Sequence, residues 1–459
     1  MKRAIDLFIL IVTGIVFANS LLWAFSVPLN GAPDEYDHFR LVAFIAEHNR
    51  IPVLPKDQDF YFSLIADHLP VAPQLVRFHE QNQKIFARAF LYELKPVYMM
   101  WPCAPYLGFA FFLKLLSFLQ NVPWIYLARI FSAVCAALTI FVAHDIFKKL
   151  APQDPVLVKM ATIFAAFLPQ FTFLGAYVNP DIVTALVATL VLRSWFFCLD
   201  ARWSARSAVV LGTALGLGIL SKISGYSVVA ATALFLFFFI PRDKGLWRYL
   251  GIVLVFCLLA SGWFFVRNHL LYADWTGYVA YTRRLAAFVN EAPRFMIEHD
   301  IFSFVNRMQY GWRALPYLFH FCFTSFWGVF SWASLRLPDI FYLIAYGLTA
   351  AGLTGAAVHF STRTKAAAGS KMTLLIAAVL GLQVAAVLVY VAMIKYQPQG
   401  RYFYPVLAPL AYVLCFGLLA FFRRAQARRA CAVGVSVFMI GLNIFSFLYC
   451  QALHYFPGI

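Results

Sequence analysis

Long apolar runs separated by short polar segments make up most of this chain. Eleven runs of about 20 mainly apolar residues can be placed, at 5–27, 124–147, 157–177, 181–199, 206–222, 224–240, 249–266, 338–359, 372–394, 402–421 and 430–450. A helix of that length crosses the hydrocarbon core of a bilayer with its backbone groups satisfied internally. The pattern therefore predicts an all-α polytopic membrane protein with about 11 transmembrane helices.

The first run follows Lys2 and Arg3, as the apolar core of a signal peptide would. The apolar stretch from Leu7 to Val27 is long enough to span a membrane, and no clear small-x-small cleavage site closes it. We expect an uncleaved first span.

Two long segments, 28–123 and 267–337, interrupt the series of runs and are richer in charge and proline. They suggest a division into a first part at 1–266, the second long segment at 267–337 and a C-terminal group of helices at 338–459. The spacing of the runs does not indicate the inverted halves of a secondary transporter.

The placement of Lys and Arg predicts the orientation, because short cytoplasmic loops carry an excess of these residues. With a cytoplasmic N-terminus, every loop on that side is basic: Lys148 and Lys149; Arg202 and Arg206; Arg242, Lys244 and Arg248; Arg363, Lys365 and Lys371; and Arg423, Arg424, Arg428 and Arg429. This agreement requires that 97–119 does not cross, so we expect there a helix along the outer surface, interrupted by Pro102, Pro105 and Lys114. By the same reasoning Tyr317–Trp332 is an interfacial or re-entrant piece, and both long segments face outward.

Composition supports the membrane interpretation and narrows the partners. The chain is 63% hydrophobic and 18% aromatic, with a mean hydropathy of +0.75. Its net charge of +17 comes from short basic clusters between apolar runs, which favours the anionic membrane surface as the partner and not nucleic acid. The eight cysteines form no CxxC pair and no zinc-ligand spacing, so neither a disulfide framework nor a metal centre is indicated.

An acidic patch follows the first run. The stretch NGAPDEYDHFRLVAFIAEHN, residues 30–49, contains the ionisable residues Asp34, Glu35, Asp37, His38, Arg40 and Glu47. Such groups beside a membrane are costly unless they face water, a partner or a substrate, so the patch is a candidate functional site. The alternative is that they cap and solvate a juxtamembrane helix begun by Asp34, or by Asn30 and Pro33.

Further polar residues occupy the other outward turns. They are Asn179 and Asp181 in VNPD, Lys222 in LSKIS, Arg267 and Asn268 in GWFFVRN, and Arg401 and Tyr402 in QPQGRYFYP. Each has a structural alternative: Lys222 would snorkel, Arg267 would anchor a helix end, and Asn179 with Asp181 would cap the next helix. Together, three cations on the outer face run against the cytoplasmic preference of Lys and Arg, which favours a site.

The chemistry that uses such residues is group transfer from a lipid phosphate. Lys222, Arg267 and Arg401, with Tyr402 beside them, would neutralise the charge that grows on a leaving phosphate. A phosphate leaves without a proton, so one carboxylate suffices as general base on the acceptor hydroxyl, and attack in line inverts the anomeric centre. We assign that role to Asp34, with Glu35 as the alternative. The remaining candidates for substrate binding are Asp37, His38, Asn179, Asp181 and Asn268.

The motifs PDEYDHF, PQFTFLGAYVNPD, GLGILSKISGY, GWFFVRNHLLY, SFWGVFSW and QGRYFYPVLAPLA occur in collinear order over 28–410. Together they resemble the DUF2142 membrane proteins of bacteria. That family looks related to the GT-C glycosyltransferases, among them the protein O-mannosyltransferases and the aminoarabinose transferase of lipid A.

The resemblance implies a GT-C catalytic module of seven spans within 1–266, with two juxtamembrane helices in the first periplasmic loop, 28–123. It also implies a polyprenyl-phosphate sugar donor and a catalytic Asp, which would be Asp34. The second juxtamembrane helix would be 97–119, in agreement with the loop charges.

This sequence departs from the family pattern at two places. The usual turn has two asparagines before Asp, where this chain has Asn179 and Pro180, and an HPP-type helix opening reads KPVYMMWPCAP here. Some members of the superfamily use a divalent metal held by acidic residues, and Asp34 with Asp181 would be the pair to hold one. We expect a metal-free site without a cofactor.

These observations support one leading function. It is an integral glycosyltransferase of the bacterial inner membrane, moving a sugar from undecaprenyl phosphate to a cell-envelope glycan, lipid or protein at a periplasmic active site. The alternatives are a transporter or flippase of a lipid-linked saccharide and a non-catalytic assembly subunit. A transporter would place ionisable residues near the middle of its spans, whereas here they gather at the ends.

Overall fold

A computed structural model of the 459-residue chain describes residues 6–29, 31–53, 56–57, 102–242, 245–280, 315–332, 334–362, 367–391 and 398–455. Within these ranges, eight helices are long and apolar enough to cross a membrane. They are α1 (Leu7–Ser26), α6 (Trp124–Leu150), α9 (Pro180–Asp200), α12 (Leu246–Tyr272), α17 (Asp339–Thr362), α18 (Ala367–Val389), the continuous pair η5 (Gly400–Val406) and α19 (Leu407–Ala420), and α20 (Ala425–Cys450).

The other three predicted runs form shorter helices. They are α7 (Pro155–Ala166) followed by α8 (Pro169–Leu174), α10 (Ala205–Ile219), and η2 (Ile223–Gly225) followed by α11 (Tyr226–Phe239). The predicted continuous span 157–177 is wrong in one respect, because the helix stops before Pro169. Proline has no N–H for the helical ladder, so α8 starts anew with Pro169 in its first turn.

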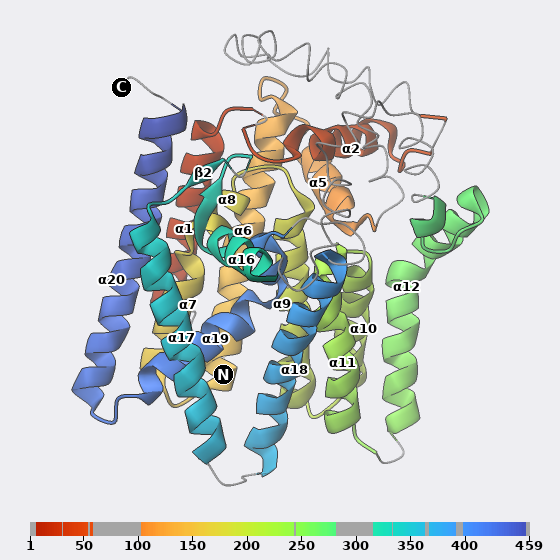
Figure 1. The fold of residues 1–459 in the computed structure, drawn as a ribbon. Helices are drawn as coiled ribbons and strands as arrows, with labels where there is room; N and C mark the ends of the chain where they lie inside the picture. Colours follow the sequence, from red (N-terminus) through yellow and green to blue (C-terminus); the bar gives the residue numbers. More distant parts are fainter. Residues whose placement is uncertain are drawn as a thin grey trace.

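The basic loops gather at one end of the bundle, the end at which α1 begins. In Figure 1 the last turns of α11 and α17, the first turns of α12 and α18, and the connection from α19 to α20 lie at this end, opposite α2 and α5. Ion pairs tie the loops together there, with Lys149 Nζ 2.6 Å from Asp200 and Arg428 paired with Asp154. The predicted placement of Lys and Arg on one side is present in the described part of the fold, while Lys244, Arg363 and Lys365 lie outside the described ranges. We call this the basic end and the opposite one the outer end.

Short elements cover the outer end. Helix α2 (Glu35–His48) lies across the top of the bundle in Figure 1 and packs against α5 (Ala104–Leu115). These are the two helices expected beside the first span, although α5 is shorter than the predicted 97–119 and residues 97–101 lie outside the described ranges. Segments 58–101 and 281–314 of the two long outer segments also lie outside them.

The predicted interfacial piece 317–332 is helical at first. Helix α16 (Leu315–Gly328) is followed by a hairpin, β1 (Val329–Phe330) paired antiparallel with β2 (Leu335–Arg336), which the sequence pattern did not predict. In Figure 1 α16 is seen nearly end-on while the spans run up the page, so it lies across the bundle. It packs against α8 and η5.

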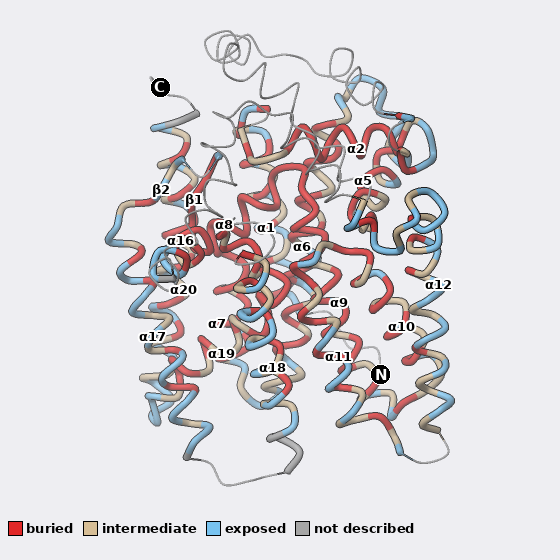
Figure 2. Tube along the Cα trace, turned by 45° about the vertical axis from the view of Figure 1, so that its right-hand side comes forward, coloured by how far each residue is buried: buried red, intermediate tan, exposed pale blue. Residues whose placement is uncertain are grey.

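One apolar core runs through the whole bundle. Its buried residues extend from Ile9 in α1 to Cys450 in α20, and Figure 2 shows the buried trace inside an exposed outer surface. That outer surface is itself apolar: on α12, for example, Leu254, Leu258 and Leu259 are exposed. A soluble protein rarely exposes so large an apolar area, whereas lipid covers it in a membrane protein. The chain is therefore a multi-pass membrane protein.

Candidate functional site

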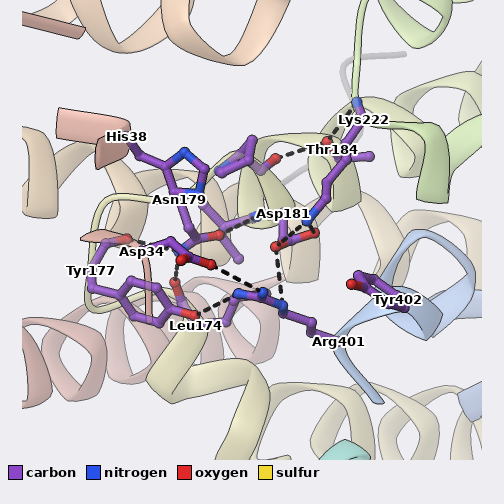
Figure 3. Close-up of polar contacts among 12 residues, drawn as sticks. Asp34, His38, Leu174, Tyr177, Asn179, Asp181, Thr184, Lys222, Arg401 and Tyr402 are labelled. Atoms are coloured by element: carbon purple, nitrogen blue, oxygen red, sulfur yellow. Dashed lines mark hydrogen bonds and ion pairs between the residues drawn. The ribbon is translucent and has the colours of Figure 1, made fainter. Parts of the chain in front are cut away.

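The candidate site lies at the outer end, where four separate segments meet. They are the start of α2, the turn between α8 and α9, the turn between α10 and α11, and the start of η5. Figure 3 shows the polar side chains that these segments direct toward one another.

The turn before α9 places Asp181. The Asn179 side chain accepts a hydrogen bond from Ile182 N at 3.0 Å and donates to the main-chain oxygens of Leu174 and Tyr177 at 2.9 and 2.8 Å. With Pro180 at the first helical position, this capped turn fixes the start of α9. Asn179 thus has a structural role, and Asp181 in the first turn is only 2% exposed.

Lys222 forms a close ion pair with this carboxylate. Its Nζ lies 2.8 and 3.0 Å from the two oxygens of Asp181, and its main-chain N donates to Thr184 at 3.3 Å. The ammonium also lies 5.2 Å from the ring centre of Tyr402. Burial has the largest effect and lowers the pKa of Lys222, and the charge of Asp181 offsets only part of this lowering. The two short contacts from Asp181 fix the position of the Lys222 ammonium.

A close backbone approach places Arg401. A Cβ at Gly400 would overlap the main-chain N of Phe326 in α16, and Gly400 N donates to the Ser325 hydroxyl at 2.8 Å. Only glycine lets η5 come this near to α16, which explains the glycine of the QGRY motif. The next residue, Arg401, is thereby directed into the centre of the cluster (Figure 3).

The Arg401 guanidinium stands between two carboxylates at long distances. It lies 3.7 Å from Asp34 Oδ2, 3.5 Å from Asp181 Oδ2 and 3.5 Å from the Tyr177 hydroxyl. Charge-assisted N–H···O bonds normally measure about 2.7–2.9 Å. Arg401 is only 7% exposed, and its Nε, which faces Asp181, makes no hydrogen bond to any residue in the described ranges. Its donors are therefore under-used for a buried arginine.

Asp34 is the more accessible of the two carboxylates. Its side chain is 17% exposed, against 2% for Asp181. Asp34 precedes α2 with φ 61° and ψ 10°, in the left-handed region, and its side chain does not cap the helix. A helix start normally uses an Asp side chain as its cap. Here the carboxylate is directed toward Arg401 instead. A residue held in the left-handed backbone region, as Asp34 is, is common at functional sites.

Glu35 has a different environment from Asp34. It is fully buried, and Arg129 on α6 donates to both of its oxygens at 2.7 and 2.6 Å, while Val178 N donates at 3.3 Å. Arg129 also donates to the main-chain oxygens of Ala24, Val27 and Pro28. This pair joins the end of α1 to the start of α2, so the geometry argues against Glu35 as the alternative base.

His38 and Asp37 line the first turns of α2. His38 Nδ1 lies 3.0 Å from the Tyr106 hydroxyl on α5, and burial lowers the pKa of His38 to about 3. The imidazole is therefore neutral near pH 7 and adds no charge to the neighbouring cluster. Asp37 lies 3.8 Å from Arg40 on the same helix. The charges of the cluster also act on His38, with Asp34 and Asp181 raising its pKa and Lys222 and Arg401 lowering it. Figure 3 shows the imidazole beside these side chains.

Arg267 and Asn268 lie apart from the cluster. Arg267 donates to the main-chain oxygens of Pro52 at 2.8 Å and Ile51 at 3.5 Å, and to the Asn268 side chain at 3.1 Å. Arg267 thus fixes the segment that follows α2 onto the end of α12. We therefore leave it out of the phosphate-binding set predicted from the sequence, in which it was the third cation.

Sequence reasoning missed residues that complete the site. Tyr177 contacts Arg401, Thr184 contacts Lys222, and Arg129 binds Glu35. Arg129 had a detectable signal, because an arginine inside an apolar run is costly and needs a partner. Tyr177 and Thr184 carried no such signal.

The two carboxylates that would hold a divalent metal, Asp34 and Asp181, already face cations. Both oxygens of Asp181 are paired with the Lys222 ammonium, and both carboxylates face Arg401. A metal would have to displace these cations to reach its oxygen ligands. Within the described ranges, no group of three or more His, Cys, Asp or Glu side chains is placed to hold a metal.

The fold matches known structures closely enough to define its class. ArnT from Cupriavidus metallidurans in the apo state aligns with a TM-score of 0.50 at 14% identity, over 96% of this chain and 76% of that one. The Archaeoglobus fulgidus oligosaccharyltransferase, in complex with Zn and sulfate, aligns with a TM-score of 0.52 at 14% identity, over 96% of this chain and 53% of that one. The chain thus spans about half the length of the latter. Both are GT-C glycosyltransferases, so this is a membrane protein with the GT-C fold.

Within that class, the chain belongs to the DUF2142 family. The family model described as "Predicted membrane protein (DUF2142)" matches residues 119–411. The matched range includes Asp181, Lys222 and Arg401, while Asp34 lies before it. No curated protein sequence matches the chain.

Proposed function

We propose that the protein is a glycosyltransferase that uses a polyprenyl-phosphate-linked sugar, of which undecaprenyl phosphate would be the lipid, at the outer end of the bundle. The observation that carries this is the buried Arg401 guanidinium, whose contacts to Asp34, Asp181 and Tyr177 all measure 3.5–3.7 Å. A phosphate oxygen is a stronger partner for a planar two-pronged donor than these distant groups. Fold similarity to ArnT and the oligosaccharyltransferase supports the same reaction class.

Arg401 and Lys222 would bind the phosphate of the donor. Both cations belong to one cluster, and Asp181, 2% exposed, holds Lys222 at 2.8 Å and faces Arg401 at 3.5 Å. Asp181 is thus a positioning residue that presents two cations from different segments of the chain to one anion. Tyr402, whose ring faces Lys222, limits where that ammonium can move.

Asp34 would act as general base on the acceptor hydroxyl. The acceptor oxygen forms a bond to the anomeric carbon while the bond from that carbon to the phosphate oxygen breaks, and the hydroxyl proton passes to Asp34. The leaving lipid phosphate gains one negative charge as Asp34 loses its own. Arg401, 3.7 Å from Asp34, then exchanges a carboxylate partner for the more highly charged phosphate. Attack in line inverts the anomeric centre.

The basic loops would lie in the cytoplasm and the site in the periplasm, because short basic loops are retained on the cytoplasmic side. A polyprenyl-phosphate sugar presents its phosphate at the headgroup level of the outer leaflet, which is where Arg401 and Lys222 would meet it. The acceptor would be an envelope glycan, lipid or protein.

The test separates a transferase from the alternative, a transporter or flippase of a lipid-linked saccharide. Detergent-solubilised protein is incubated with an undecaprenyl-phosphate sugar and an extract of the cell envelope, and free undecaprenyl phosphate is measured by mass spectrometry. A transferase releases the lipid phosphate without a sealed membrane. Movement of the intact donor in sealed vesicles, with no release in detergent, would establish the transporter instead.

A further inference from the structure

A second polar cavity lies at the basic end, remote from the candidate site. It has a volume of about 490 Å³ and is lined by the ends of α1, α6 and α7, with the polar residues Asp6, His144, Lys148, Lys149 and Lys159. This volume is within the usual range for ligand sites. We propose that it binds the headgroup of an anionic phospholipid that carries a hydroxyl group, of the phosphatidylglycerol type.

His144 is one of the residues that line this cavity. His144 is only 3% exposed, and its Nε2 makes no hydrogen bond to any residue in the described ranges. The nearest acidic group is Asp6, whose Oδ2 lies 4.0 Å away and which caps α1 through Phe8 N. A buried polar atom without a hydrogen-bond partner needs an explanation. A ligand group that reaches His144 from the cavity would supply the missing bond.

The tautomer of His144 defines what that ligand group must be. The Thr162 hydroxyl donates its proton to Val158 O at 2.7 Å, so its oxygen accepts from His144 Nδ1 at 2.9 Å. A neutral imidazole with its proton on Nδ1 has a lone pair on Nε2. Nε2 therefore needs a donor. A ligand hydroxyl supplies one, whereas a ligand ammonium would be repelled by the lysines around it.

The charge of the lining favours a phosphate. Lys148 and Lys159 are exposed, and Lys159 Nζ lies 5.5 Å from the Phe8 ring, whose centre is 5.8 Å from that of the imidazole. Lys149 is paired with Asp200 at 2.6 Å. Two lysines thus remain to meet a phosphate, and Asp6 is the acidic residue of the lining. Basic pockets between helices at the cytoplasmic surface are the known setting for anionic lipid headgroups.

The surface beside the cavity is apolar. Leu7, Leu10 and Ile11 on α1 are 68%, 46% and 52% exposed, so the acyl chains of a lipid would meet an apolar helix face next to its headgroup. A soluble phosphate compound would gain nothing from this face. The structure therefore favours a lipid as the source of the phosphate.

The experiment is thermal unfolding of the purified full chain during titration with defined lipids. Phosphatidylglycerol is expected to raise Tm saturably, and phosphatidylcholine with the same acyl chains is not. Lys159→Gln should increase the apparent dissociation constant of phosphatidylglycerol about fivefold, the effect of one lysine near an anionic surface. Arg248→Gln is the matched control, because Arg248 is an exposed cation of the basic end outside the cavity. Equal effects of Lys159→Gln and Arg248→Gln would overturn the proposal.

Two further arms test the ligand chemistry. Wild-type protein should prefer phosphatidylglycerol to phosphatidylethanol, which has the same charge and no headgroup hydroxyl, and His144→Leu should remove that preference. Soluble glycerophosphoglycerol should have little effect. Stabilisation by the soluble headgroup equal to that by the lipid, or an unchanged preference in His144→Leu, would contradict the assignment.

Discussion

Two buried arginines show how side chains of the same type serve different purposes in this protein. Arg129 makes five hydrogen bonds of 2.5–3.1 Å to Glu35 and three main-chain oxygens, so its donors are satisfied. Arg401 is 7% exposed and makes its contacts at 3.5–3.7 Å. The first is a structural residue, and the second has the capacity to bind an anion.

Replacing Arg401 tests this difference at the residue scale. Arg401→Gln should weaken donor binding about 10- to 150-fold, the equivalent of about 1.5–3 kcal/mol for a hydrogen bond to a charged group. Binding of a fluorescent polyprenyl-phosphate sugar would measure the change. Arg267→Gln is the matched comparison, since Arg267 binds main-chain oxygens of the α2 segment. An equal loss of donor affinity in both variants would refute the distinction between a ligand-binding Arg401 and a structural Arg267.

His38 gives a pH-dependent prediction. Its pKa is lowered from 6.5 to about 3 because burial disfavours the charged imidazole. The unfolded chain binds the proton below pH 6.5 and the folded chain does not, so stability should fall as pH drops from 6.5 toward 3, by up to about 1.4 kcal/mol per unit. Thermal unfolding of His38→Gln should be less sensitive to acid than wild type. His269→Gln, at an exposed position, should keep the wild-type sensitivity.

The sequence predicted the charged members of the site better than their roles. Asp34, Lys222 and Arg401 do converge, because ionisable residues at the outer ends of apolar runs are costly without a partner or a ligand. Arg267 binds main-chain oxygens in the structure, and a helix-end arginine looks the same in a sequence whether it binds a ligand or a main-chain oxygen. Glu35 was weighed beside Asp34, and only the position of Arg129 separates them.

At the scale of elements, the connection between α1 and α2 depends on the Glu35–Arg129 pair. Removing one partner of a buried pair leaves an uncompensated charge and costs about 3–5 kcal/mol. Glu35→Leu and Arg129→Leu should each destabilise the protein by that order, measured by denaturation in mixed micelles. The double variant should lose less than the sum of the two. Additive losses would mean that the pair does not act as a unit.

The close packing of η5 on α16 makes a second prediction at this scale. Gly400→Ala forces the backbone away from Phe326, which should shift Arg401 and weaken donor binding. Gly381→Ala in α18 is the control, because a Cβ there meets nothing within 4 Å. Unchanged donor affinity in Gly400→Ala, with the protein folded, would show that Arg401 does not depend on this contact.

Element boundaries were predictable where one strong local signal acted. Asn179 with Pro180 caps α9, which was the structural alternative for Asn179, and Pro169 splits the predicted span 157–177 into α7 and α8. The β1–β2 hairpin had no signal, because two residues per strand are too few for an alternating pattern. Tertiary contacts decide such short elements.

At the scale of the whole molecule, charge separates the two ends of the bundle. The basic loops and the proposed lipid site lie at one end, and the cluster of Asp34, Asp181, Lys222 and Arg401 lies at the other (Figures 1 and 3). The sequence predicted this asymmetry through the loop charges alone. It could not place η5 beside the turn after α10, because that contact joins residues far apart in the chain.

The most direct test of the proposed mechanism is turnover by Asp34→Asn, measured with donor binding in the same preparation. Asn tolerates the left-handed backbone at φ 61° and keeps the side-chain shape, so the fold and the phosphate cluster should persist. Without the base, turnover should fall about 10²- to 10⁴-fold while donor affinity changes little. Glu47→Gln on the same helix should behave as wild type. Wild-type turnover by Asp34→Asn would remove Asp34 from the mechanism and contradict its role as the base.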